Sequence, residues 1–267
     1  MKEKEYRVLK TPYGDLIPNA TYSDVRKKYR ESVTYYEDGS LKSVYLEEPQ
    51  PIETVVGTID AELITFYPDG TIKRIFPLYG QLSGYWTETE EYELLKEQPV
   101  ELFGKVRNLK PLCICFYPGG GIKTLTIWPR SELYIDTKYG TIKTQFGLAL
   151  TEAGRLKSIE PAFGEKLETE YGVIYPYDPA NYRLHAEGNS LCFDENGNIT
   201  QFKTIKNKIE IREKQETIVL EPVFETDFLT GNKVIRAMEV SFREKRVQIS
   251  VDEEHSYDIG TEQVVFR

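Results

Sequence analysis

Two closely spaced cysteines are the first residues to consider as metal ligands or nucleophiles. Cys113 and Cys115 belong to an apolar run with strand composition, so both side chains would point to one face. A zinc site would need two further ligands, and the histidines, His185 and His255, have no ligand-like spacing to this pair. The alternative is that the cysteines are small apolar side chains of a strand. We therefore expect no metal site and no cofactor.

Enzymatic chemistry would require a histidine, a cysteine or a carboxylate pair held in a cleft. His185 has Glu187 nearby and His255 follows three acidic residues, but the sequence identifies no partner for either. It also has no phosphate-binding glycine loop, zinc-binding helix motif or nucleophile elbow. We therefore predict that the protein is not an enzyme. Glycosidase carboxylates leave no local signature, so a carbohydrate-processing activity stays open.

An aromatic loop is the best candidate interaction site. Gln81 lies between two glycines, the pair Tyr85 and Trp86 follows, and a short acidic helix is expected to begin at Thr89. Tyrosine and tryptophan offer a large contact area with a polar end, and both are enriched in binding hot spots. We predict Gln81, Tyr85, Trp86 and the second tryptophan, Trp128, as binding residues. The alternative is that the tryptophans close the ends of a sheet without a second layer.

Four lysines occupy the same position after a glycine turn: Lys42, Lys73, Lys123 and Lys157. Aligned across neighbouring hairpins, they would form a row able to bind phosphate or carboxylate groups. Lysine at such a position also keeps a solvent-facing surface charged and discourages edge pairing. We prefer the second interpretation.

Two kinds of glycine turn alternate along the chain and would position these residues. The first reads Thr-x-x-Gly and starts at residues 11, 54, 137 and 169, with Glu101 in a variant copy. The second reads aromatic-x-x-Asp/Asn-Gly-x-Ile/Leu-Lys, with weaker later copies, and its glycines are residues 39, 70, 120, 154 and 197. Asp-Gly and Asn-Gly between β-branched and aromatic runs are strong hairpin signals. We predict an all-β, tandem-repeat antiparallel meander of five units over residues 1–204, forming an open, extended and twisted sheet.

The turn motif stops after residue 204, although strand-like segments continue. The end of a repeat array exposes an unpaired edge that must be covered, so residues 205–267 are expected to form a β-rich C-terminal cap. A closed, propeller-like ring is the alternative architecture, since five units could in principle close. The uneven unit lengths favour the open sheet.

Composition limits the classes of partner. The 34 basic and 43 acidic residues give a net charge of -9, so broad attraction to nucleic acid or anionic lipid is not expected. The sequence has no apolar run long enough for a membrane span and no secretion signal at its start. We expect a cytoplasmic protein.

The second turn motif is similar to the hairpin repeats of the MORN class (membrane occupation and recognition nexus) and of related bacterial repeat proteins described as antitoxin-like. The similarity rests on residues 36–42, 67–73, 117–123 and 151–157. Residues 80–86 also resemble a segment of a family of uncharacterised bacterial proteins. This resemblance implies an extended β-meander scaffold that contacts other proteins.

The sequence therefore predicts a non-enzymatic binding or scaffold protein whose β-repeat surface contacts another protein, with a homo-oligomer as a further option. A carbohydrate-binding or carbohydrate-processing β protein is the alternative. It is motivated by 19 tyrosines and two tryptophans, whose rings can stack on sugars.

Overall fold

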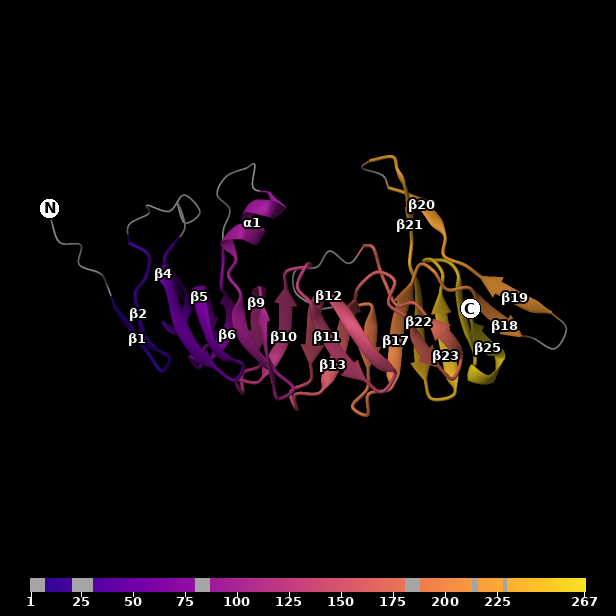
Figure 1. Cartoon of the computed structure of the whole chain (residues 1–267), viewed down its shortest axis with the longest axis horizontal. Helices are drawn as coiled ribbons and strands as arrows, with labels where there is room; N and C mark the ends of the chain where they lie inside the picture. The colour runs from indigo at the N-terminus through magenta and orange to yellow at the C-terminus, as the bar shows by residue number, and fades with distance from the viewer. Residues whose placement is uncertain (1–7, 21–30, 80–86, 181–187, 213–215, 228–229) are drawn as a thin grey trace. The chain divides into compact units, whose positions relative to one another are not determined.

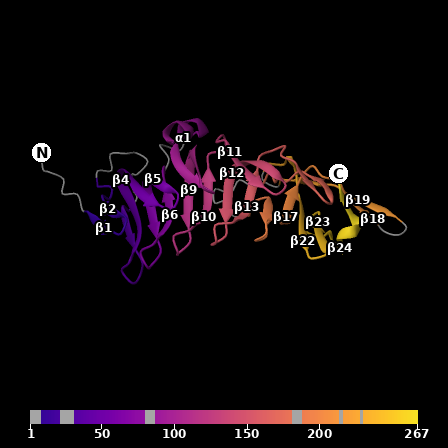
Figure 2. The same cartoon turned by 60° about the horizontal axis from the view of Figure 1, so that its bottom comes forward.

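The computed structural model describes residues 8–20, 31–79, 87–180, 188–212, 216–227 and 230–267, and it is all-β with antiparallel meander sheets (Figures 1 and 2). The predicted fold class is thereby confirmed. In the described residues neither compact unit closes its sheet into a barrel or ring, so the ring alternative is wrong. The two compact units are Met1–Ser131 with Leu150–Gly154, and Glu132–Ala149 with Arg155–Arg267. The five-unit repeat and the boundary at residue 204 stay predictions.

The first unit contains one meander sheet, two further hairpin strand pairs and one short helix. Its sheet has the strand order β10-β9-β6-β5-β4-β3, and the other pairs are β1-β2 and β7-β8. The elements are β1 (Leu9–Thr11), β2 (Gly14–Leu16), β3 (Val33–Tyr35), β4 (Leu41–Thr54), β5 (Gly57–Phe66), β6 (Ile72–Phe76), α1 (Glu88–Leu94), β7 (Gln98–Leu102), β8 (Lys105–Leu109), β9 (Pro111–Phe116) and β10 (Ile122–Ile127).

The second unit contains two sheets and a hairpin. One sheet has the order β24-β23-β22-β17-β16-β13-β12, with β11 also paired to β12; the other has the order β14-β15-β25-β18-β19, and β20 pairs with β21. The elements are β11 (Leu133–Thr137), β12 (Gly140–Leu150), β13 (Leu156–Pro161), β14 (Leu167–Thr169), β15 (Gly172–Ile174), β16 (Leu191–Phe193), β17 (Ile199–Thr204), β18 (Ile209–Arg212), β19 (Thr217–Leu220), β20 (Phe224–Thr226), β21 (Lys233–Ile235), β22 (Met238–Arg243), β23 (Arg246–Ser250), β24 (Ser256–Gly260), the 3-10 helix η2 (Thr261–Gln263) and β25 (Val264–Phe266).

Strand register divides the sheet of the first unit into an apolar and a polar face. Directly paired residues share a face, and successive residues of a strand alternate between faces. One row across five strands is apolar and 0% exposed: Val44, Ile64, Ile75, Ile114 and Leu125. The neighbouring row on the other face carries Thr34, Ser43, Thr65, Arg74, Cys115 and Thr124. The apolar row therefore supplies a core, and the second row lies on the opposite face, where Cys115 and Thr124 are also buried.

The second unit repeats this division. Its apolar row is also 0% exposed and consists of Ile159, Leu191, Phe202, Val240 and Ile249. At roughly 25 cal/mol per Å² of apolar surface removed from water, such rows are the main stabilising contribution in each unit.

The Asp-Gly turns share one hydrogen-bonding pattern. The N–H of the turn glycine donates to the carbonyl of a tyrosine three residues earlier, as Gly39 does to Tyr36, Gly70 to Tyr67 and Gly120 to Tyr117. The φ angles of Gly39 and Gly70, 84° and 86°, belong to the left-handed region that favours glycine. Each aspartate accepts hydrogen bonds from the residue two positions later, which lowers the pKa of Asp38 and Asp69.

The tyrosine of each of these turns also bonds to a strand that follows later in the chain. The hydroxyl of Tyr36 donates to the carbonyl of Phe66 at 2.8 Å, and that of Tyr67 donates to Phe116 at 2.9 Å. Tyr117 makes the same bond to Leu150 at 2.9 Å. Successive hairpins of the first unit are therefore joined by side-chain bonds as well as by the sheet ladder.

The Thr-x-x-Gly turns also share a geometry. The hydroxyls of Thr11, Thr54, Thr137 and Thr169 donate to the carbonyl of the turn glycine at 2.7 to 2.8 Å. In the first unit, Gln98 links two of these hairpins by accepting from the N–H of Asp60 at 2.7 Å and donating to its carbonyl at 3.1 Å. Their buried apolar residues include Ile52, Ile59 and Val100. We infer that these hairpins cover the apolar face of the sheet.

Helix α1 begins two residues earlier than expected. Its cap is Thr87, whose hydroxyl accepts the N–H of Glu90, while the Glu90 side chain accepts the N–H of Thr87. This capping box requires a glutamate three residues after the cap, which Thr87 has and Thr89 lacks.

We predict that Tyr67→Phe lowers the free energy of unfolding by about 1 kcal/mol, because it removes a half-buried hydrogen bond and leaves a carbonyl unpaired. Urea denaturation measures the change. The matched control is Tyr92→Phe, because that hydroxyl makes no hydrogen bond within the described part of the chain. Equal stability losses in the two variants would contradict a structural role for the tyrosine link.

Candidate functional site

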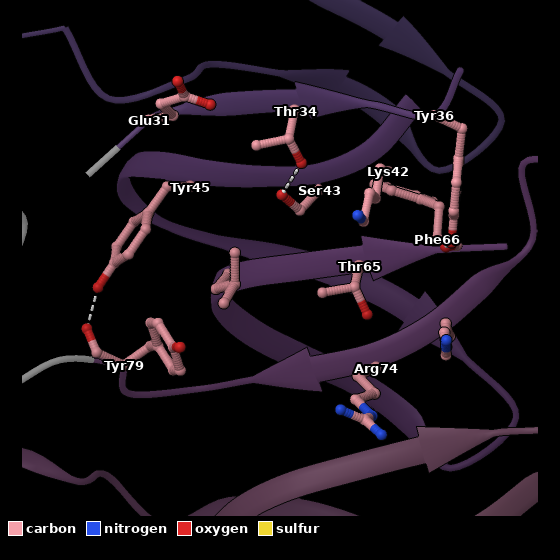
Figure 3. A pocket seen from close by; sticks show the side chains of 12 residues that line it. Glu31, Thr34, Tyr36, Lys42, Ser43, Tyr45, Thr65, Phe66, Arg74 and Tyr79 are labelled. Atoms are coloured by element: carbon pink, nitrogen blue, oxygen red, sulfur yellow. Dashed lines mark hydrogen bonds between the residues drawn. The ribbon is translucent and has the colours of Figure 1, made fainter. Parts of the chain in front are cut away.

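A hollow of about 470 Å³ lies on the polar face of the first unit, over strands β3 to β6 (Figure 3). Three cations and three hydroxyl-bearing side chains contribute to its lining, and we call this group the cationic hollow: Thr34, Lys42, Ser43, Thr65, Lys73 and Arg74. The hollow therefore combines positive charge with groups that can donate hydrogen bonds.

The sheet register places four of these residues in a single row. Thr34 pairs with Ser43, Ser43 with Thr65, and Thr65 with Arg74, so each comes from a successive strand. The hydroxyls of Thr34 and Ser43 are 2.5 Å apart and hydrogen-bonded (Figure 3). By contrast, Thr65 Oγ1 is buried and has no hydrogen-bond partner within the described residues. The row thus contains a buried hydroxyl with unused hydrogen-bonding capacity.

The three cations have no carboxylate partner at ion-pair distance among the residues described. Lys42 Nζ lies 5.6 Å from the ring centre of Tyr36, and Lys73 Nζ lies 5.4 Å from that of Tyr67. Burial raises the pKa of Tyr67, whereas the charges of Lys123 and Arg74 act to lower it. Among the described residues that line the hollow, Glu31 is the single carboxylate, so these residues together carry a net charge of +2. The local charge is therefore opposite in sign to that of the whole chain.

A pair of tyrosines closes one end of the hollow. The hydroxyl of Tyr45 donates to the carbonyl of Tyr79, and their ring centres are 5.7 Å apart (Figure 3). The N–H of Tyr79 donates to the buried carboxylate of Glu62 at 3.0 Å. These contacts fix the wall of the hollow on the side away from the Asp-Gly turns.

The lining chemistry suits binding of an oxyanion. Lysine and arginine side chains only donate hydrogen bonds, and a hydroxyl can donate one. Of the lining residues that the structure describes, Glu31 is the one carboxylate and none is a histidine or cysteine. The three cations and the hydroxyls make the lining better suited to binding an anion than to proton abstraction.

The residues predicted from sequence have mixed placements. Gln81, Tyr85 and Trp86 lie outside the described residues, so that interaction site stays a prediction. Trp128 is 3% exposed and packs against Tyr92, with ring centres 5.8 Å apart. Its indole N–H is buried and has no partner within the described residues. Trp128 therefore lies in the interior, and its predicted binding role stays a prediction.

Sequence analysis identified part of the cationic hollow and missed the rest. Lys42 and Lys73 belong to the predicted lysine row, whereas Lys123 and Lys157 do not line the hollow. Arg74 and the hydroxyl residues were not predicted, although polar residues on strands that otherwise carry apolar ones are a usable signal.

The cysteines and histidines have local roles in the structure. The sulfurs of Cys113 and Cys115 are 3.7 Å apart and both residues are buried. Within the described ranges no group of three potential metal ligands occurs. His255 Nδ1 lies 2.8 Å from the carboxylate of Asp252, and this contact lowers the pKa of Asp252. His185 and Glu187 lie outside the described residues.

Comparisons with protein-family models, with curated proteins and with solved structures found no match. Among the helices that the structure describes, none is long and apolar enough to cross a membrane.

We predict that the native thiols react slowly with a disulfide reagent at about pH 8, because the thiolate is the reactive form. The contact with Cys115, together with burial, raises the pKa of Cys113 well above its ordinary value, and burial raises that of Cys192 to about 11. Spectrophotometric titration should show all three thiols reacting promptly only in denaturant. Prompt reaction of one thiol in the native protein would contradict these environments.

Proposed function

We propose that the protein is a non-enzymatic binding module that contacts another protein through the cationic hollow on strands β3 to β6. The observation that carries this proposal is the set of three cations that line one hollow and have no carboxylate at ion-pair distance among the residues that the structure describes. A ligand with negatively charged oxygens would supply the missing partner.

The three cations carry an energetic cost when no anion is bound. Cations held on adjacent strands repel one another. A folded protein that keeps these features gives up stability at this surface. Binding of an anionic group would recover the cost, which supports a ligand at this site.

The charge distribution favours contact with a single acidic group over contact with a long polyanion. The chain carries a net charge of -9, so a long polyanion such as nucleic acid would be repelled by most of the surface. A single acidic group of a protein partner experiences mainly the cations of the hollow, because salt screens charges beyond about 8–10 Å.

The resemblance to MORN-like scaffold proteins supports the same class of function, and we propose a cytoplasmic location in keeping with it. The loop that contains Gln81, Tyr85 and Trp86 remains a second proposed contact with the partner. In this proposal the loop contributes apolar contact area, and the hollow contributes charge.

Partner capture tests the proposal. Protein immobilised from the wild type and from the variant Lys73→Glu/Arg74→Glu is exposed to lysate of the source cells, and captured proteins are identified by mass spectrometry. A specific protein should then be purified and its affinity measured; reversing two cations should weaken it at least about tenfold, since every 1.4 kcal/mol is a factor of ten.

The matched control is Lys10→Glu/Lys96→Glu, which makes the same change of charge at two exposed lysines of the same unit. This control should retain the partner, and circular dichroism should show that both variants are folded. Equal affinity of the purified partner for wild type and for Lys73→Glu/Arg74→Glu would exclude the hollow as its binding site.

A further inference from the structure

We propose, as an extension that rests on the proposed function, that the cationic hollow binds a phosphate monoester on an extended segment of the partner protein. The hollow would thereby distinguish a phosphorylated partner from an unphosphorylated one. The argument uses the charge, the hydrogen-bond donors and the dimensions of the site.

The charge of the hollow matches a phosphate monoester better than a carboxylate. Lys42, Lys73 and Arg74 oppose one carboxylate, Glu31, so the lining has a net charge of +2. A phosphorylated side chain carries a charge of about -1.5 to -2 at neutral pH, whereas a glutamate or aspartate carries about -1. A phosphate group neutralises the lining, and a single carboxylate leaves positive charge uncompensated.

The donors of the hollow suit a group with several oxygens. The guanidinium of Arg74 presents a planar fork that binds phosphate through two parallel hydrogen bonds. Lys73 adjoins Arg74 on β6, and Thr65 lies directly opposite Arg74 on β5. The guanidinium of Arg74 and the ammonium of Lys73 together provide enough N–H donors for all three oxygens of a phosphate monoester.

The dimensions of the hollow favour a segment over a free ion. The row from Thr34 to Arg74 crosses three strand spacings, or about 14 Å at the usual separation between paired strands. An extended chain of about four residues has this length. An isolated phosphate would occupy only the Arg74 end, and the hydroxyls of Thr34 and Ser43 would remain available to the backbone of a flanking segment.

The direct test uses a capped five-residue peptide with a central phosphoserine between alanines, titrated into the full-length protein by isothermal calorimetry at fixed ionic strength. The same peptide with glutamate in place of phosphoserine and inorganic phosphate are the comparison ligands. We expect the phosphopeptide to bind at least about tenfold more tightly than either. Equal binding of the glutamate peptide, or of inorganic phosphate, would overturn the assignment to a phosphorylated segment.

Three variants locate the bound phosphate. Arg74→Gln should weaken phosphopeptide binding about tenfold or more, and Lys73→Gln should weaken it about threefold to tenfold, as expected for loss of a charge-assisted hydrogen bond. Lys10→Gln/Lys96→Gln should have no effect. Unchanged affinity in Arg74→Gln, with circular dichroism showing a native fold, would overturn the inference.

The pH dependence provides a second readout. Affinity should fall as the pH is lowered from about 7.5 to about 5.5, because the second pKa of a phosphate monoester is about 6 and the monoanion carries less charge. The charged side chains that line the hollow, among the residues described, are Lys42, Lys73, Arg74 and Glu31. A flat profile would contradict binding of the dianion.

Phosphatase treatment of the partner separates failure of this inference from failure of the proposed function. Loss of capture after dephosphorylation supports both. Capture that survives dephosphorylation but is abolished by Lys73→Glu/Arg74→Glu would overturn the phosphate inference and leave the proposed function intact. If the phosphopeptide binds but Lys73→Glu/Arg74→Glu still captures the partner, the proposed function is overturned and the phosphate site remains.

Discussion

Strand register is the constraint on which both the core and the candidate site depend. Arg74 and Ile75 are neighbours on β6, yet one lines the polar hollow and the other is fully buried. Because side chains alternate along a strand, a slip of one residue would move the arginine into the core and the isoleucine to the surface. Burying an unpaired guanidinium costs a large amount of free energy, so the slipped register is strongly disfavoured. The register that buries the apolar row is therefore also the one that assembles the site. The hollow is in this sense a product of core formation on the opposite face.

The Asp-Gly turns connect this register to the positions of the cations. Each turn tyrosine is tied to a later strand through its hydroxyl, and the lysine that follows the turn extends over the ring of that tyrosine at Lys42 and Lys73. A long lysine side chain packs its methylene stem on an apolar surface and keeps its charge in water. The same turn therefore contributes to stability through the tyrosine and to the electrostatics of the hollow through the lysine. Lysines at this position can keep the surface charged and can also line a binding site, so the two interpretations of the lysine row are compatible.

The sequence predicted the local features of the fold well because short-range chemistry determines them. Asp-Gly and Thr-x-x-Gly turns are specified by hydrogen bonds within five residues, so their positions could be read directly. The hollow was harder to predict because Thr34, Ser43, Thr65 and Arg74 come into one row only through the exact register of three successive strand pairs. Trp128 shows the opposite difficulty, since residue type alone cannot distinguish a buried indole from an exposed one. The start of α1 could have been found from the glutamate three residues after Thr87.

The tyrosine links span very different lengths of chain while keeping the same bond. The hydroxyl and its acceptor are 30 residues apart for Tyr36, 49 for Tyr67 and 33 for Tyr117. Each span contains one hairpin, and the longest also accommodates α1 between β6 and β7 without altering the turn or the bond. The entropy cost of closing a loop grows only with the logarithm of its length, so lengthening such a span is inexpensive once both ends are fixed. Foreign segments could therefore be inserted at the hairpin ends opposite the Asp-Gly turns while the strands of the sheet keep their pairing.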